Sequence, residues 1–160
     1  MSRSSLTTYL NDHIAGSVAA LELLEHLAGL YRGTEREKLL QSLRSEIEDD
    51  QRVLQQVLEQ VGGKESRVRK AAAWLTEKIG EAKLKLDDPG NGELRVLEAL
   101  ESLGLGIQGK LALWRALAAV SDRVPQLRTL DYGQLQRRAF EQHQLVEAQR
   151  LQAAQLALVP

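Results

Sequence analysis

The residue whose type and position most strongly suggest chemistry is Asp50. Apolar side chains flank it at steps of three and four, with Ile47 before it and Leu54 after it, so its carboxylate falls on the buried stripe of a helix. A carboxylate is costly to bury unless a cation, a metal ion or several hydrogen-bond donors surround it. The sequence therefore indicates that Asp50 either binds something or is paired inside the fold.

Three arrangements around Asp50 are consistent with the sequence. We expect structural pairing with His13, His143 or the hydroxyl of Ser17, which would fix helix register as a lone polar residue does in a coiled coil. Alternatively, a metal ion would bind Asp50 together with His143 and Glu147, although these last two also match an ordinary surface pair one helical turn apart. In the third arrangement an arginine draws the carboxylate to the solvated edge, the candidates being Arg44, Arg52 and Arg137.

Composition excludes several other kinds of site. The 160 residues include no cysteine, which removes disulfides, thiolate metal sites and cysteine nucleophiles. With 21 basic against 22 acidic residues and a formal net charge of −1, there is no basic surplus to neutralise phosphates, so we expect no nucleic-acid partner. The sequence shows neither an 18-residue apolar run nor the apolar core of a signal peptide. We therefore expect no membrane partner and a cytoplasmic protein.

A glycine-rich stretch matches the G-x-G-x-x-G pattern of dinucleotide-binding loops, with Gly104, Gly106 and Gly109 at the three glycine positions. That chemistry requires a strand before the glycines and the N-terminus of a helix after them. Here the glycines lie inside a helical apolar pattern, with Leu100 before them and Leu111 after them. We therefore predict either close helix packing at this stretch or a local weak point of the helix, and no nucleotide binding.

The elements that must position Asp50 are predicted to be helices only. Residues that favour helices dominate the chain, and no segment alternates apolar and polar residues as a strand would. The connection Arg32-Gly33-Thr34 is so short that the first two helices must lie antiparallel as neighbours. We expect one all-α domain over residues 1–160, with long helices at about 6–31, 35–61, 93–120 and 132–158 and a connecting helix at about 66–85.

Four helices of this length describe a four-helix bundle, and the connecting helix between the second and third is long enough to travel most of the bundle. We expect it to be a crossover that carries the chain back along the bundle, with plain up-and-down packing as the alternative. These seams, helix lengths and crossover resemble the ferritin-like superfamily over nearly the whole chain. The resemblance implies two iron or manganese ions at the centre of four helices, bound by single glutamates from two helices and a Glu-x-x-His pair from each of the others.

The Glu-x-x-His pair of that family is absent from this sequence. Each of the three histidines follows an apolar residue at the third position before it, as Phe140 precedes His143. Residue counts along the predicted crossover bundle place acidic and imidazole groups of three helices near a common height. The third long helix offers glycine at that height. The candidate metal ligands are Glu22, Glu46, Asp50, His143 and Glu147.

We therefore predict a non-enzymatic ferritin-like bundle without an intact di-metal centre, in which no cofactor is expected. The alternative is a di-iron or di-manganese carboxylate protein that handles iron or peroxide. We also predict self-association into a homo-oligomer such as a homodimer, because the apolar face of the third long helix is wider than one seam and a second copy would cover it. The leucines that widen this face are Leu103, Leu105, Leu113 and Leu117.

Overall fold

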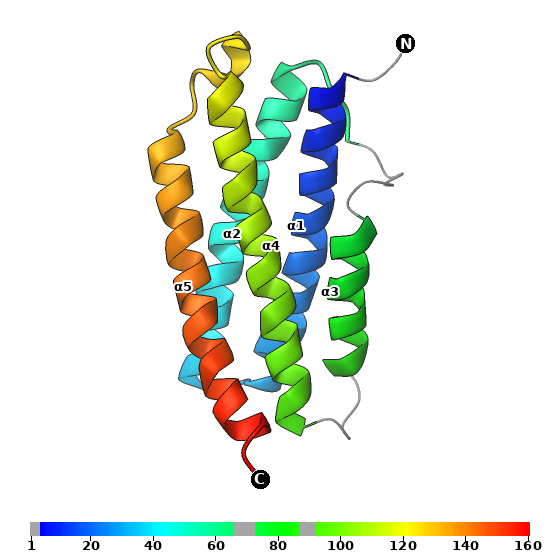
Figure 1. Ribbon diagram of the computed structural model, residues 1–160, viewed down its shortest axis with the longest axis vertical. Helices are drawn as coiled ribbons and strands as arrows, with labels where there is room; N and C mark the ends of the chain where they lie inside the picture. The colour runs from blue at the N-terminus through cyan, green and yellow to red at the C-terminus, as the bar shows by residue number, and fades with distance from the viewer. Residues whose placement is uncertain (1–3, 66–72, 87–91) are drawn as a thin grey trace.

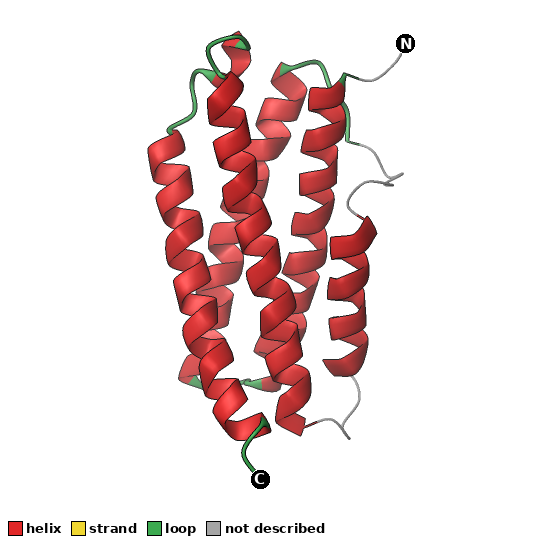
Figure 2. Cartoon of the chain, viewed as in Figure 1, coloured by secondary structure: helices red, strands yellow, loops and turns green. Residues whose placement is uncertain are grey.

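The computed structural model describes residues 4–65, 73–86 and 92–160, and helices are the only regular elements in these ranges. Figure 2 shows helices, drawn in red, as the bulk of the described structure, with loops and turns in green. The prediction of an all-α fold is therefore confirmed for the described part of the chain. Its helices are α1 (Ser5–Leu30), α2 (Glu35–Gln60), α3 (Ala73–Leu86), α4 (Gly92–Val120) and α5 (Tyr132–Ala157), with a short 3-10 helix at Pro125–Leu127 before α5.

The helices lie side by side with their long axes nearly parallel (Figure 1). The helix α1 runs away from the end where the chain begins, α2 returns to it, α3 runs away again, α4 returns, and α5 runs to the opposite end. The shorter helix α3 packs against both α1 and α4. It occupies most of the predicted connecting helix, whose first residues, 66–72, lie outside the described ranges.

Local side-chain chemistry explains where the long helices begin. The Thr34 hydroxyl caps α2 by accepting from the Glu37 amide at 3.3 Å, while the Glu37 carboxylate accepts from the Gly33 amide at 2.6 Å. Gly33 has φ +81°, a left-handed conformation that side chains resist, and this lets the chain reverse between α1 and α2. The Asp131 carboxylate caps α5 by accepting from the Gln134 amide at 3.0 Å.

The core consists of two apolar clusters stacked along the bundle. One cluster includes Ile47 of α2 and Ile107 of α4, and the other includes Leu54 of α2 and Leu113 of α4. Asp50 lies between the two clusters on α2 and is 2% exposed, as its place on the apolar stripe predicts. The boundary between the clusters is therefore a polar layer, and this layer holds the candidate site.

The apolar face of α4 is covered largely by the chain itself. Leu103, Leu113 and Leu117 are at most 1% exposed, and among the four leucines named for self-association only Leu105 remains open to solvent, at 47%. The reason is that α4 packs against α1, α3 and α5, and three neighbours require a broad apolar face. Self-association stays a prediction, but it loses this support.

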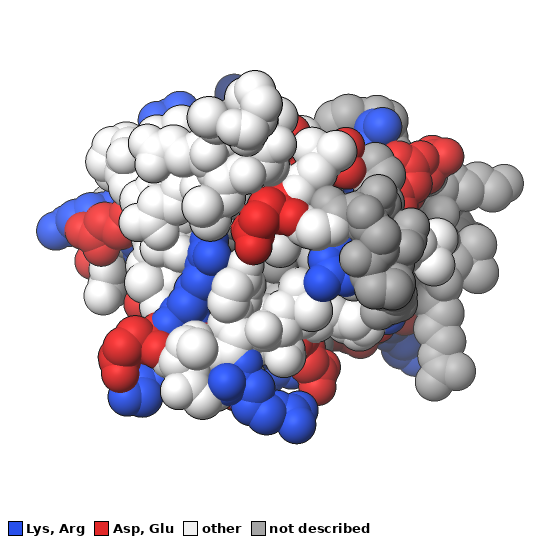
Figure 3. All heavy atoms as spheres, turned by 90° about the horizontal axis from the view of Figure 1, so that it is seen from below, with Lys and Arg blue, Asp and Glu red and all other residues white. Residues whose placement is uncertain are grey.

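Exposed apolar residues also occur in the last part of the chain, and Figure 3 views the end of the bundle where the C-terminus lies, part of which is without charged side chains. These apolar residues include Leu156, Leu158 and Val159.

No helix in the described ranges combines the length and the apolar character that crossing a membrane requires.

Candidate functional site

Asp50 is the centre of a buried ion network that joins α2, α4 and α5. Its Oδ2 accepts a hydrogen bond from Lys110 Nζ at 2.5 Å, and its Oδ1 accepts from the guanidinium of Arg138. The side chain of Lys110 is 12% exposed and that of Arg138 is 28% exposed. Burial lowers the pKa of the Lys110 ammonium, and attraction to the Asp50 carboxylate opposes that shift. Asp50 is thus neutralised by two side-chain cations.

Gln142 of α5 links this pair to a second carboxylate. Its Oε1 accepts from Lys110 Nζ, and its Nε2 donates to Glu46 Oε2 at 3.1 Å and to Asp50 Oδ2 at 3.3 Å. Gln142 is 2% exposed, so its amide is fully committed to the network. The network contains two carboxylates and two cations, and this balance makes its burial tolerable.

Neither Lys110 nor Gln142 was predicted as a site residue, although both interrupt apolar series with helical spacing. The seam through α4 passes through Leu103, Ile107, Lys110 and Trp114 in steps of four and three, and the seam through α5 has Gln142 between Ala139 and Val146. A second series through Gly104 and Leu111 fits α4 equally well by spacing alone. The signal that separates the two is a lysine at a seam position, opposite in charge to Asp50.

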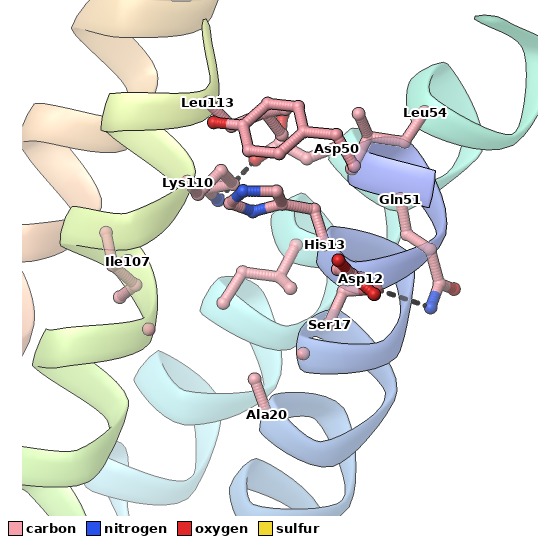
Figure 4. Close-up of a pocket in the computed structure, with 14 residues that line it drawn as sticks. Asp12, His13, Ser17, Ala20, Asp50, Gln51, Leu54, Ile107, Lys110 and Leu113 are labelled. Atoms are coloured by element: carbon pink, nitrogen blue, oxygen red, sulfur yellow. Dashed lines mark hydrogen bonds and ion pairs between the residues drawn. The ribbon is translucent and has the colours of Figure 1, made fainter. Parts of the chain in front are cut away.

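A cavity of about 390 Å³ lies beside the network, between α1, α2 and α4. Figure 4 shows Asp50 and Lys110 on its wall, with His13 of α1 pointing toward Lys110. Small side chains leave the space for this cavity, since α1 contributes Gly16, Ser17 and Ala20 to its lining and α4 contributes Gly106. The larger apolar side chains of its walls are Ile47, Leu54, Ile107 and Leu113.

The α1 side of the cavity adds uncharged polar groups and one carboxylate. The rings of Tyr9 and His13 meet edge to face, with centroids 4.7 Å apart. Burial lowers the pKa of the His13 imidazole and raises the pKa of the Asp12 carboxyl group. The Ser17 hydroxyl donates to a backbone carbonyl of α1 and accepts from Gln51 Nε2 at 2.8 Å. The cavity is thus mostly apolar, with a few oriented polar groups.

The five predicted metal ligands do not form one site. Glu46 and Asp50 are brought together through Gln142, but Glu22 pairs with Lys83 of α3 at 3.2 Å. Within the described ranges, no group of three or more histidine, aspartate and glutamate side chains could hold a metal ion.

His143 and Glu147 line a groove between α4 and α5, together with Gly104 and Arg150. His143 Nε2 lies 2.9 Å from Gln108 Nε2, and both carboxylate oxygens of Glu147 accept from Arg150 at 2.7 Å. Neighbouring residues on a helix point about 100° apart. The rotation of α5 therefore presents Gln142 to Asp50 and leaves His143 in the groove.

The expected structural pairing of Asp50 is present, but with partners other than those predicted. Lys110 and Arg138 take the place of His13, His143 and the Ser17 hydroxyl. Of the arginines considered, Arg44 pairs with Glu48 and Arg52 pairs with Asp49.

The glycines of the G-x-G-x-x-G match lie inside α4, as predicted, and helix precedes them where a dinucleotide-binding loop would need a strand.

No family model, curated protein or solved structure matches this chain. The site itself is therefore the basis for the function.

Proposed function

We propose that this chain is a non-enzymatic, ferritin-like helical bundle that binds a small organic molecule in the cavity between α1, α2 and α4. The observation that carries the proposal is the cavity of about 390 Å³ whose mostly apolar wall includes the buried Asp50–Lys110 pair. Small-molecule sites typically combine such walls with a few fixed polar groups, in pockets of roughly 300–1,000 Å³.

The chain directions support the ferritin-like part of the proposal. The pairs α1–α2 and α4–α5 are each antiparallel, and α3 returns the chain along the bundle between them (Figure 1). One long crossover connection of this kind separates ferritin-like bundles from plain up-and-down bundles.

The ion network favours a protein cation over a metal at the bundle centre. Both oxygens of Asp50 accept hydrogen bonds from positively charged side chains, and Lys110 contacts the carboxylate at 2.5 Å. A divalent ion at Asp50 would have to displace Lys110 and Arg138 and leave one or both unpaired in a low-dielectric region. The geometry therefore supports the bundle without a di-metal centre better than the iron- or peroxide-handling alternative.

The polar groups of the cavity favour binding over catalysis. Ser17 is the serine nearest in sequence to His13, but it donates to the carbonyl of Ile14 at 2.6 Å. A serine nucleophile would instead need to donate to a histidine that acts as base. Lys110 and Asp50 form hydrogen bonds with each other and with side chains of α5.

A neutral fluorescent probe tests the proposal directly. N-phenyl-1-naphthylamine should bind the wild-type chain saturably with a rise in emission. Replacing Ala20, which lines the cavity and is 7% exposed, by leucine should abolish that signal, because the added atoms fill the space. The matched control is Ala116→Leu on the exposed side of α4, which should bind like the wild type. Failure of the folded wild-type chain to bind the probe would refute the proposal.

Iron loading tests the alternative. After anaerobic incubation with iron and removal of excess metal, elemental analysis should find the purified protein essentially free of iron. Stoichiometric iron that is lost in Asp50→Asn would favour the metal protein instead.

A further inference from the structure

Among the residues that the structure describes, the hydrogen bonds of Lys110 leave one of its N–H donors unused. An ammonium group carries three N–H donors, and in Lys110 two of them bind Asp50 Oδ2 and Gln142 Oε1. The first partner lies on α2 and the second on α5. Because an ammonium is tetrahedral, the third N–H points away from both partners. Lys110 lines the cavity, so that side of the ammonium is the α1 side, across which His13 points toward it (Figure 4).

The charges around the cavity favour a neutral ligand. The network of Asp50, Glu46, Lys110 and Arg138 is already balanced, so a charged ligand would introduce an unpaired charge beside a mostly apolar wall. Asp12 also lines the cavity and would repel an anion when ionised. Burial lowers the pKa of His13, so its imidazole is neutral at pH 7 and supplies no compensating charge.

The size of the cavity limits the ligand further. A dry apolar cavity of about 150 Å³ holds one benzene molecule. The cavity here is about 390 Å³, between two and three times that volume. Its apolar wall, which includes Ile47, Ile107 and Leu113, suits a fused two-ring body or an aliphatic body of similar volume.

We infer that the cavity takes a neutral, largely apolar molecule of about two fused rings that bears one carbonyl group. The carbonyl oxygen accepts the third N–H of Lys110, and the ring body fills the space between α1, α2 and α4. This inference rests on the proposed binding function and specifies the chemical class of its ligand. A hydrogen bond from a charged donor in such a site is among the stronger neutral-ligand contacts, so the carbonyl dominates selectivity.

Three naphthalenes of matched shape test the ligand class. In displacement of N-phenyl-1-naphthylamine from the wild-type chain, 2-acetylnaphthalene should bind about tenfold or more tightly than 2-ethylnaphthalene, which lacks the acceptor. The anion 2-naphthoate should bind most weakly of the three. Lys110→Met keeps the length of the side chain and removes the donor, so in this variant acetylnaphthalene should fall to the affinity of ethylnaphthalene.

A second measurement uses the wild-type chain alone, in case Lys110→Met does not fold. The carbonyl carbon of 13C-labelled 2-acetylnaphthalene should move downfield on binding, relative to its position in a hydrocarbon solvent, because the oxygen accepts a hydrogen bond. An unshifted carbonyl resonance would overturn the inference.

The outcomes separate this inference from the binding function. If the probe binds but the three naphthalenes compete equally, or naphthoate competes best, the ligand class is wrong while the binding function stands. If neither the probe nor any naphthalene binds the folded protein, the binding function itself fails.

Discussion

Two polar clusters lie on different faces of α4, and they are built from the same kinds of side chain. Asp50 and Lys110 belong to the cluster beside the cavity, whereas Glu147, Arg150 and His143 belong to the α4–α5 groove. Asp50 is 2% exposed, while the Glu147 side chain is 35% exposed. Side-chain hydrogen bonding from Arg150 lowers the pKa of Glu147, but water can replace most of that interaction.

Burial, and not residue type, distinguishes the site around Asp50 from the surface pair in the groove. By sequence, the His143 and Glu147 combination looks more like a ligand pair than an aspartate and a lysine 60 positions apart. In the fold, the second pair is removed from water, shares Gln142 and lines a cavity. The buried pair stabilises the fold only when both partners are present, because either one alone would be an unpaired charge in the core.

The largest expected effect comes from breaking the buried cluster. Asp50→Asn leaves Lys110 and Arg138 without their carboxylate, so the free energy of unfolding measured by urea titration should fall by about 3–5 kcal/mol. Glu147→Gln, in the groove, should change it far less, because water screens and can replace the exposed pair with Arg150. Adding Lys110→Met to Asp50→Asn should recover part of the loss, because fewer charges then remain unpaired. Equal losses in Asp50→Asn and Glu147→Gln would contradict the distinction between the two clusters.

An effect of intermediate size is expected in the pH dependence of stability, through His13 on the α1 wall of the cavity. Burial lowers the pKa of His13 below its usual 6.5, so below that pH the unfolded chain binds a proton that the folded chain resists. The contribution of His13 to stability is therefore intact above pH 6.5 and is lost as pH falls through that value toward the lower folded pKa. His13→Phe should flatten urea-derived stability between pH 6.5 and 5, and the partly exposed His26→Gln is the control. An unchanged slope in His13→Phe would contradict this role.

The smallest effect compares two glycines of α4. A Cβ at Gly109 meets nothing within 4 Å, and a Cβ at Gly106 meets Ile79 Cδ1 at an ordinary 3.9 Å. Alanine at either position should therefore raise the free energy of unfolding by up to about 1 kcal/mol, through helix propensity. Only Gly106 lines the cavity, so only Gly106→Ala should also weaken binding of the fluorescent probe. Equal probe affinity in both variants would mean that the probe binds outside the cavity.

Much of the fold was predictable because its signals are local. The predicted helix 35–61 corresponds to Glu35–Gln60 and the predicted helix 93–120 to Gly92–Val120, since caps and breaks act within one or two turns. The burial of Asp50 was equally predictable, because a single apolar series runs through α2. On α4, two different series of residues have the spacing of a buried helical stripe. Which of them is buried depends on the neighbouring helices that cover each face.

The sequence by itself determined the helices, their order and the burial of one carboxylate. Only the tertiary structure decided what that carboxylate meets, because Lys110, Arg138 and Gln142 are 60, 88 and 92 positions away along the chain. Their convergence depends on the rotation of α4 and α5 about their axes, and a shift of one residue turns a side chain by about 100°. The cavity has the same origin, because its lining comes from α1, α2 and α4 and forms only when these three helices pack together.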